Sequence, residues 1–172
     1  MAIIYKSFKL QFTRIFPLLL LYFLSVSEID TEFSNYFEIL SFNLQLIIVY
    51  YWMLKYPWLL GNGHIFFAGI INDVVTGLPL GASALSYLVA SFVASYIRNV
   101  TVNKSFFTEW FTFLLAIFFS NLFFYSLIGK FSDFELFYIN IFYNALFTFL
   151  LFPIFWVIFN IYVQLIGSIQ ND

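Results

Sequence analysis

Long apolar segments alternate with short polar segments along the whole of this 172-residue chain. The hydrocarbon core of a bilayer is about 30 Å thick, and about 20 helical residues cross it with every backbone hydrogen bond satisfied. Six segments therefore predict membrane-spanning helices: residues 12–26, 36–54, 64–76, 80–97, 107–128 and 136–165. The third is short for a full crossing, and the sixth is long enough to tilt or to extend beyond the bilayer.

Composition supports a membrane rather than an aqueous environment. Hydrophobic residues make up 63% of the chain and charged residues only 9%, whereas a soluble domain is about 25% charged. The 27 Phe, 12 Tyr and 4 Trp are spread over nearly the whole length, so no separate polar domain is expected. We predict a single all-α membrane domain covering residues 1–172, built as a bundle of about six transmembrane helices.

The basic residues predict the orientation of these helices, because Lys and Arg concentrate in cytoplasmic loops. Six of them fall on one side of the predicted alternation: Lys6, Lys9, Arg14, Lys55, Arg98 and Lys104. Only Lys130 falls on the other side. Both ends of the chain are therefore expected in the cytoplasm. A cleaved signal peptide is the alternative for the first segment, but it would leave five spans and upset the charge alternation.

Several function classes lack their usual sequence features. The net charge is −2 and no basic run is present, which argues against nucleic acid as a partner. There is no cysteine and a single histidine, His64, which removes thiol nucleophiles, iron–sulfur clusters and Cys/His zinc sites. No phosphate-binding loop, dinucleotide fingerprint or zinc-protease helix occurs. We expect no enzymatic activity, no cofactor and no metal, with His64 an interfacial residue.

Asp73 is the acid that these spans place deepest in an apolar segment, where a carboxylate needs compensation. Gly69, Asp73 and Gly77 are spaced four apart and share a helix face, on which the glycines admit a neighbouring backbone. Pro79 cannot continue the helix, so Gly77 to Gly81 predicts a tight connection between the third and fourth spans.

Two roles for Asp73 remain open at this point. It could accept hydrogen bonds from backbone amides at the start of the fourth span, or from Asn72, Thr76 or Ser83, and so hold the turn. Alternatively, it could form an ion, proton or ligand site, a common role for acids within membranes. An intramembrane aspartyl protease would need a second acid at the same depth to share a proton, and the sequence has none there.

Other polar and aromatic residues predict contacts between helices or with the membrane surface. Interhelical hydrogen bonds are expected from Asn43, Gln45, Asn121, Asn140, Asn144, Thr148 and Asn160. Three of these, Asn140, Asn144 and Thr148, form a stripe expected in the bundle interior or against another membrane protein. The aromatic segment from Tyr50 to Trp58 is typical of a membrane–water interface; a partner-binding surface is the alternative.

An ordered string of residues in the middle third of the chain resembles one known family. It consists of Trp52 (after Tyr51), Pro57, Gly61, Gly69, Asp73, Gly77, Pro79 and Gly81. This string is similar to that of the rod shape-determining protein MreD family. The short length and the six predicted spans also look like that family, so the resemblance extends over essentially the whole chain.

The resemblance implies a non-catalytic scaffold of the bacterial cell-wall elongation (rod) complex, in the inner membrane, that takes part in cell shape and side-wall peptidoglycan synthesis. It implies association with an MreC-like bitopic protein and, through it, with the MreB filament, a SEDS glycosyltransferase and a class B penicillin-binding protein.

The resemblance also implies a fold similar to the S-components of ECF transporters. A small-molecule binding or transport subunit is therefore the alternative function. In either case the motif residues that shape the third and fourth spans would be Gly69, Asp73, Gly77, Pro79 and Gly81, and none would be catalytic. One departure is clear, because Trp58 to Gly63 has no basic residue, whereas family members often have several there.

Overall fold

The structure is a computed structural model that describes residues 15–27, 43–101, 105–131 and 138–171. The helices are Ile15–Val26, α2 (Leu44–Lys55), α3 (Pro57–Leu60), α4 (Asn62–Val75), α5 (Ala82–Val100), α6 (Phe106–Phe131) and α7 (Tyr138–Asn171). No strand occurs in these ranges. The predicted all-α fold class is thereby confirmed.

Local sequence explains the breaks around α2 and α3. The Asn43 side chain accepts a hydrogen bond of 2.8 Å from the backbone N–H of Leu46 and caps the start of α2. Tyr56 precedes a proline and leaves the helical region with a φ of −138°. Pro57 then begins α3, where its missing N–H costs nothing. Gly61, with a φ of +63°, separates α3 from α4.

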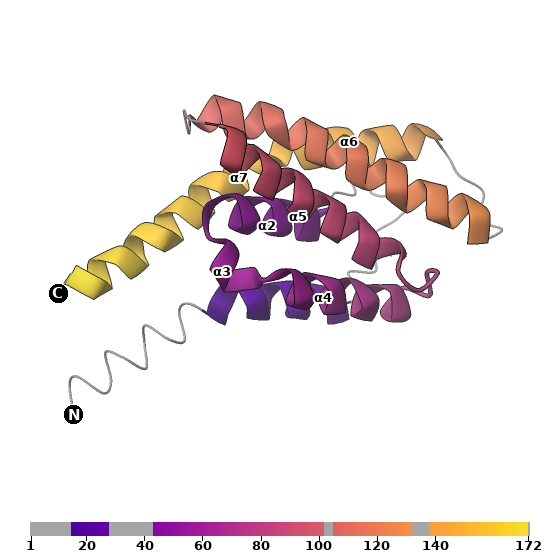
Figure 1. Ribbon diagram of the computed structural model, residues 1–172, viewed down its shortest axis with the longest axis horizontal. Helices are drawn as coiled ribbons and strands as arrows, with labels where there is room; N and C mark the ends of the chain where they lie inside the picture. The colour runs from indigo at the N-terminus through magenta and orange to yellow at the C-terminus, as the bar shows by residue number, and fades with distance from the viewer. Residues whose placement is uncertain (1–14, 28–42, 102–104, 132–137, 172) are drawn as a thin grey trace, which may run out of the picture.

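The core is organised around α2 and α5. Every residue of α2 from Leu46 to Leu54 is buried, as expected for a helix that is apolar all round. Helix α5 packs against α2, α4 and α6 (Figure 1). Its buried side chains include the small residues Ala82, Ser83, Ala84, Ser86, Ala90, Ser91 and Ala94. Small side chains let neighbouring helices approach closely.

Aromatic rings connect α2 to α6 and α7. The ring centroids of Phe113 and Phe152 lie 4.5 Å apart, and that of Tyr50 lies 4.9 Å from Phe113. All three side chains are fully buried. Pairs at these separations contribute about 0.5–1.5 kcal/mol beyond their area burial. These three rings therefore join α2, α6 and α7 in the described core.

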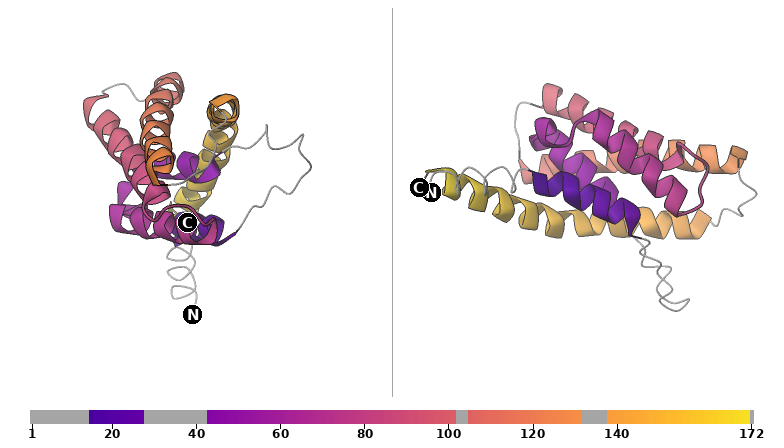
Figure 2. Two further views of the ribbon diagram at one scale, coloured as in Figure 1. Left: turned by 90° about the vertical axis from the view of Figure 1, so that its right-hand side faces the viewer. Right: turned by 90° about the horizontal axis from the view of Figure 1, so that it is seen from below.

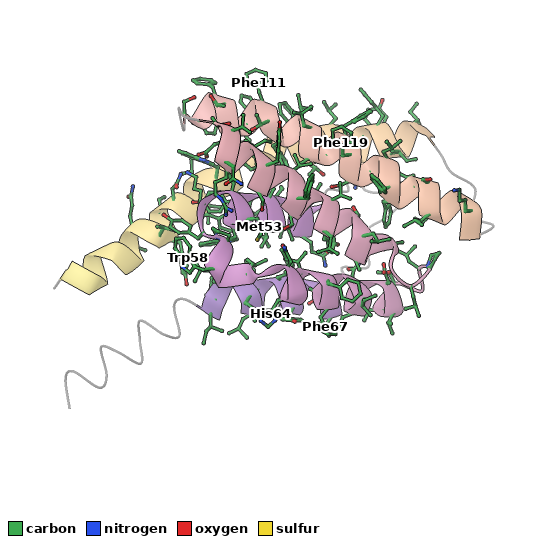
Figure 3. The ribbon with its side chains drawn as sticks, in the orientation of Figure 1. Met53, Trp58, His64, Phe67, Phe111 and Phe119 are labelled. Atoms are coloured by element: carbon green, nitrogen blue, oxygen red, sulfur yellow. The ribbon has the colours of Figure 1, made fainter. Side chains whose placement is uncertain are left out.

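Among the described residues, two helices are long and apolar enough to cross a membrane. The apolar windows run from Phe106 to Lys130 in α6 and from Ile141 to Leu165 in α7. Of an 18-residue apolar stretch within each range, only 28% and 17% is buried within the protein, whereas the core helix of a soluble protein is mostly buried. Large apolar side chains such as Phe111 and Phe119 point outward from α6 (Figure 3). These faces favour association with lipid.

Apart from α3, which lies between the second and third predicted segments, the described helices overlap the predicted segments. Helix α4 begins at Asn62 rather than at residue 64, and α7 continues to Asn171 rather than ending at residue 165. With 34 residues, α7 is about 51 Å long at 1.5 Å per residue, and it reaches beyond the other helices (Figure 2). Residues 12–14 and 36–42 of the first two segments lie outside the described residues. Six crossings and the cytoplasmic location of both ends stay predictions.

Candidate functional site

Asp73 lies fully buried near the end of α4 and holds the start of α5. Its Oδ2 accepts a hydrogen bond of 2.8 Å from the backbone N–H of Gly81, and its Oδ1 accepts one of 2.8 Å from that of Ser83. The first amides of a helix have no partner within the helix, and a negative group there is favourable. The first of the two expected roles, a hydrogen-bonded clamp on the turn, is therefore present.

The turn between α4 and α5 needs two glycines. Gly77 and Gly81 have φ values of +66° and +98°, which residues other than glycine rarely adopt. Pro79 lies between them, and its carbonyl oxygen accepts a hydrogen bond of 3.1 Å from the backbone N–H of Ala82. The predicted tight connection is confirmed.

Gly69 brings the backbones of α4 and α5 into direct contact. A Cβ atom at this position would lie 2.3 Å from the Cα atom and 2.6 Å from the backbone nitrogen of Ala84. Only a residue without a side chain fits this approach. The expected role of Gly69 is confirmed, and with Asp73 it fixes α4 against α5. The same expectation for Gly77 is wrong, because α4 ends at Val75 and a Cβ atom added at Gly77 would meet no atom within 4 Å.

Trp52, Pro57 and Gly61 form a second group, remote in the fold from the Asp73 turn. The Trp52 ring packs against Tyr56 and Phe159 at centroid distances of 5.8 Å, and its Nε1 is the one buried side-chain polar atom in the described residues without a hydrogen-bond partner. Trp52 is buried in the core, as are its neighbours Tyr50 and Tyr51. For these three residues the interface interpretation is wrong, because α2 is enclosed by other helices. Trp58, by contrast, is 72% exposed (Figure 3).

A polar cavity of about 430 Å³ lies beside the Asp73 turn. It is lined mainly by amides and hydroxyls, including those of Asn43, Gln45, Asn72, Ser83, Tyr87, Asn121, Tyr125 and Asn144. A chain of hydrogen bonds runs through it. The Tyr87 hydroxyl donates to Gln45 Oε1, Gln45 Nε2 donates to Asn72 Oδ1 at 3.0 Å, and Asn72 Nδ2 donates to Ser83 Oγ at 3.0 Å. No charged side chain lines this cavity among the described residues.

Several of the expected interhelical hydrogen bonds are present. Besides the Gln45–Asn72 pair, the backbone N–H of Asn43 donates to Thr148 Oγ1 at 2.9 Å, and the Tyr51 hydroxyl donates to Asn160 Oδ1 at 2.9 Å. Thr148 is buried, as its position in the predicted stripe requires. The side chain of Asn140 lies outside the described ones.

A buried charged cluster, formed by Lys55, Glu109 and Trp156, is a feature that the sequence pattern did not reveal. Glu109 in the first turn of α6 is 6% exposed. Its Oε2 lies 3.2 Å from Lys55 Nζ and accepts a hydrogen bond of 2.6 Å from Trp156 Nε1. The Lys55 ammonium also lies 4.8 Å from the centroid of the Trp156 ring. The position of Glu109 inside a predicted span was the available signal, because an acid there needs a partner.

Arg98 lies close to this cluster. Its Nη1 donates a hydrogen bond of 3.1 Å to the backbone oxygen of Met53, which lies within the bundle near the end of α2 (Figure 3). A second cavity, of about 220 Å³, is lined by Lys55, Arg98 and Glu109 together with threonine and apolar side chains.

His64 is exposed near the start of α4, and its Nδ1 lies 3.2 Å from the hydroxyl of Tyr22. Its expected place at a membrane interface stays a prediction. Within the described ranges, no group of three His, Asp or Glu side chains is placed to hold a metal ion. No family model, curated protein or solved structure matches this chain.

Proposed function

We propose that this chain is a six-span protein of the bacterial inner membrane, with both ends in the cytoplasm, and a non-catalytic scaffold of the cell-wall elongation complex. In this role it binds the transmembrane helix of an MreC-like bitopic protein. Through that protein it connects to the MreB filament, the SEDS glycosyltransferase and the class B penicillin-binding protein.

The ordered string from Gly69 to Gly81 carries this proposal. In the structure, Gly69 allows close approach of two backbones, Asp73 clamps two amides, and Gly77 and Gly81 adopt left-handed turns. All of these features shape the α4–α5 pair. Because these residues determine backbone geometry rather than form a chemical site, they support the proposal of a protein that presents helices to a partner.

The distribution of charge supports the orientation within this proposal. Lys55 and Arg98 lie near the ends of α2 and α5, beside the start of α6. Lys130 lies in the last turn of α6, at its opposite end. Cationic residues gather on the cytoplasmic side of a membrane, so the end with Lys55 and Arg98 is the cytoplasmic one in this proposal.

Depletion in a rod-shaped bacterium that carries this chain tests the scaffold role. We expect the depleted cells to become round and to lose directed side-wall synthesis, measured by microscopy and by incorporation of a fluorescent cell-wall precursor. Affinity purification from native membranes should recover an MreC-like protein. Cells that keep their rod shape after complete depletion would contradict the proposal.

The polar cavity favours a second candidate function, a small-molecule binding or transport subunit. Its volume of about 430 Å³ lies in the range of ligand pockets, roughly 300–1,000 Å³. The Asn121 side chain and the Tyr125 hydroxyl line it without any hydrogen-bond partner in the described part of the chain. Such groups are available to an uncharged polar ligand.

Native mass spectrometry of the detergent-solubilised protein separates these two functions. A binding subunit retains a small molecule, and a Gln45→Leu substitution in the cavity should reduce its occupancy. Recovery of an MreC-like partner without any retained molecule would instead support the scaffold.

A further inference from the structure

The cavity beside Arg98, called here the Arg98 cavity, has an excess of positive charge. Its lining contains two cationic side chains, Lys55 and Arg98, and one acidic side chain, Glu109. The carboxylate of Glu109 is already engaged, by Lys55 Nζ at 3.2 Å and by Trp156 Nε1 at 2.6 Å. Arg98 therefore supplies the charge that is not compensated within the cavity.

Arg98 keeps most of its hydrogen-bonding capacity. A guanidinium group has five N–H donors, and Arg98 uses one nitrogen, Nη1, to contact the Met53 carbonyl oxygen. The Lys55–Glu109 pair is the only ion pair in the described ranges, so Arg98 has no acidic partner there. The hydroxyl of Thr101, which also lines the cavity, has no hydrogen-bond partner among these residues. These groups together offer donors to an oxyanion.

The apolar wall and the small volume of the Arg98 cavity indicate which kind of anion would fit. Leu54 and Ile97 form part of its wall, and the outer faces of α5 and α6, two of the helices that line it, expose Phe92, Val100, Phe107 and Phe111. A volume of about 220 Å³ is below the usual range for a drug-sized ligand, about 300–1,000 Å³. The cavity thus suits a small charged group attached to an apolar tail.

We propose that the Arg98 cavity binds the phosphate of an anionic phospholipid, with Arg98 as the principal donor and the acyl chains on the exposed apolar side chains of α5 and α6. A guanidinium group matches the phosphate geometry with paired N–H donors. Basic pockets between helices at the cytoplasmic membrane surface are suited to such head groups. The inference rests on the membrane placement in the proposed function and is independent of the protein partner.

Native mass spectrometry of the full-length protein in mixed micelles tests this site. The probes are dioleoylphosphatidylglycerol, which is anionic, and dioleoylphosphatidylcholine, whose choline cation opposes Arg98. We expect at least fivefold more bound phosphatidylglycerol than phosphatidylcholine. Arg98→Gln should remove this preference, and Arg98→Lys should keep most of it because the charge remains.

Lys130→Gln is the matched control, because it removes the same charge from an exposed side chain at the other end of α6. It should leave the lipid preference unchanged. Thr101→Val removes a hydroxyl without changing charge and should weaken retention of phosphatidylglycerol about two- to threefold, which tests the site even if Arg98→Gln does not fold.

Competition experiments separate the sources of the anion. Inorganic phosphate at millimolar concentration should not displace phosphatidylglycerol, because it lacks the apolar tail. Displacement by inorganic phosphate would indicate a site for a free anion, and displacement by a glutamate-rich peptide would indicate a protein partner; either result overturns the proposal. An unchanged lipid preference in Arg98→Gln also overturns it. A protein found in the cytosol would instead refute the membrane placement.

Discussion

Two residues of α4, a glycine without a side chain and a buried aspartate, determine how α4 packs against α5. Asp73 accepts hydrogen bonds from the amide of Gly81, just before α5, and from that of Ser83 in its first turn, and the absence of a side chain at Gly69 lets the two helices approach. Buried amides that lose their acceptor carry a desolvation cost of about 1–3 kcal/mol each. The stability of this turn therefore depends on individual atoms, and single substitutions can test it.

Replacement of Asp73 should destabilise the fold in a graded way. Asp73→Asn keeps one acceptor oxygen but directs an N–H₂ group at the second amide, and we expect a loss of about 1–3 kcal/mol. Asp73→Ala leaves both amides unsatisfied and should cost more. Thermal unfolding in detergent measures both effects. Val74→Ala, an exposed neighbour in the same helix, should change little. Equal stability of Asp73→Ala and the parent would refute the clamp.

Gly69 and Gly63 provide a matched pair in α4. Gly69→Ala places a methyl group 2.3 Å from the Ala84 Cα atom, and the helices must separate, at a cost of about 1–3 kcal/mol or more. Gly63 has nothing within 4 Å of an added Cβ, so Gly63→Ala should be neutral or stabilising by up to about 1 kcal/mol. A lower melting temperature for Gly63→Ala than for Gly69→Ala would contradict this packing.

At the scale of the elements, α2 and α5 organise the fold and the charged cluster connects α2, α6 and α7. Glu109 comes from α6, Lys55 from α2 and Trp156 from α7. Breaking a buried ion pair by removing one partner leaves the other charge without compensation. The cluster is thus a joint between three helices as well as an electrostatic pair.

A double-mutant cycle should reveal this joint. Glu109→Gln leaves the Lys55 ammonium, which is 21% exposed, without its counter-charge, and we expect a destabilisation of about 3 kcal/mol at most, since partial exposure reduces the cost. Lys55→Met should have a similar effect on unfolding in detergent. The double variant should be less destabilised than the sum of the two. Strict additivity would indicate that the pair is not coupled.

Features that depend on residues close together in the sequence could be predicted, whereas features that depend on contacts between distant segments could not. The Asp73–Gly81 turn could be predicted, because the glycine conformations, the proline and the carboxylate all lie in one short segment. The Lys55–Glu109 pair could not, because it depends on which faces of α2 and α6 meet, and no local pattern encodes that. For the same reason, the sequence of α2 predicted that its aromatic residues lie at the membrane–water interface, whereas neighbouring helices bury them.

At the scale of the whole molecule, apolar side chains cover the outer sides of α6 and α7, while polar and charged side chains gather in two cavities. This arrangement is suited to a lipid surrounding, in which apolar side chains face acyl chains and polar groups are satisfied inside the protein. In the proposed function the chain crosses the membrane with both ends in the cytoplasm, and this orientation predicts which side of the membrane each loop faces.

The absence of native cysteine makes the orientation directly measurable. Asn99→Cys near the end of α5 and Lys130→Cys near the end of α6 introduce single exposed thiols. With a membrane-impermeant maleimide on intact spheroplasts, we expect labelling of Lys130→Cys and labelling of Asn99→Cys only after lysis. The cysteine-free parent is the control. The reverse pattern would invert the proposed topology.

The clamp at the end of α4 also bears on how the chain is made. With 14 residues, α4 is about 21 Å long at 1.5 Å per residue, and its last turn contains an amide and a carboxyl side chain. Alone, such a segment is a poor substrate for transfer into lipid. Its acceptor groups meet their donors only once Gly81 and Ser83 have left the ribosome. In the proposed six-span arrangement, we therefore expect α4 to wait in the insertion channel and to enter the bilayer together with α5, as one helical hairpin.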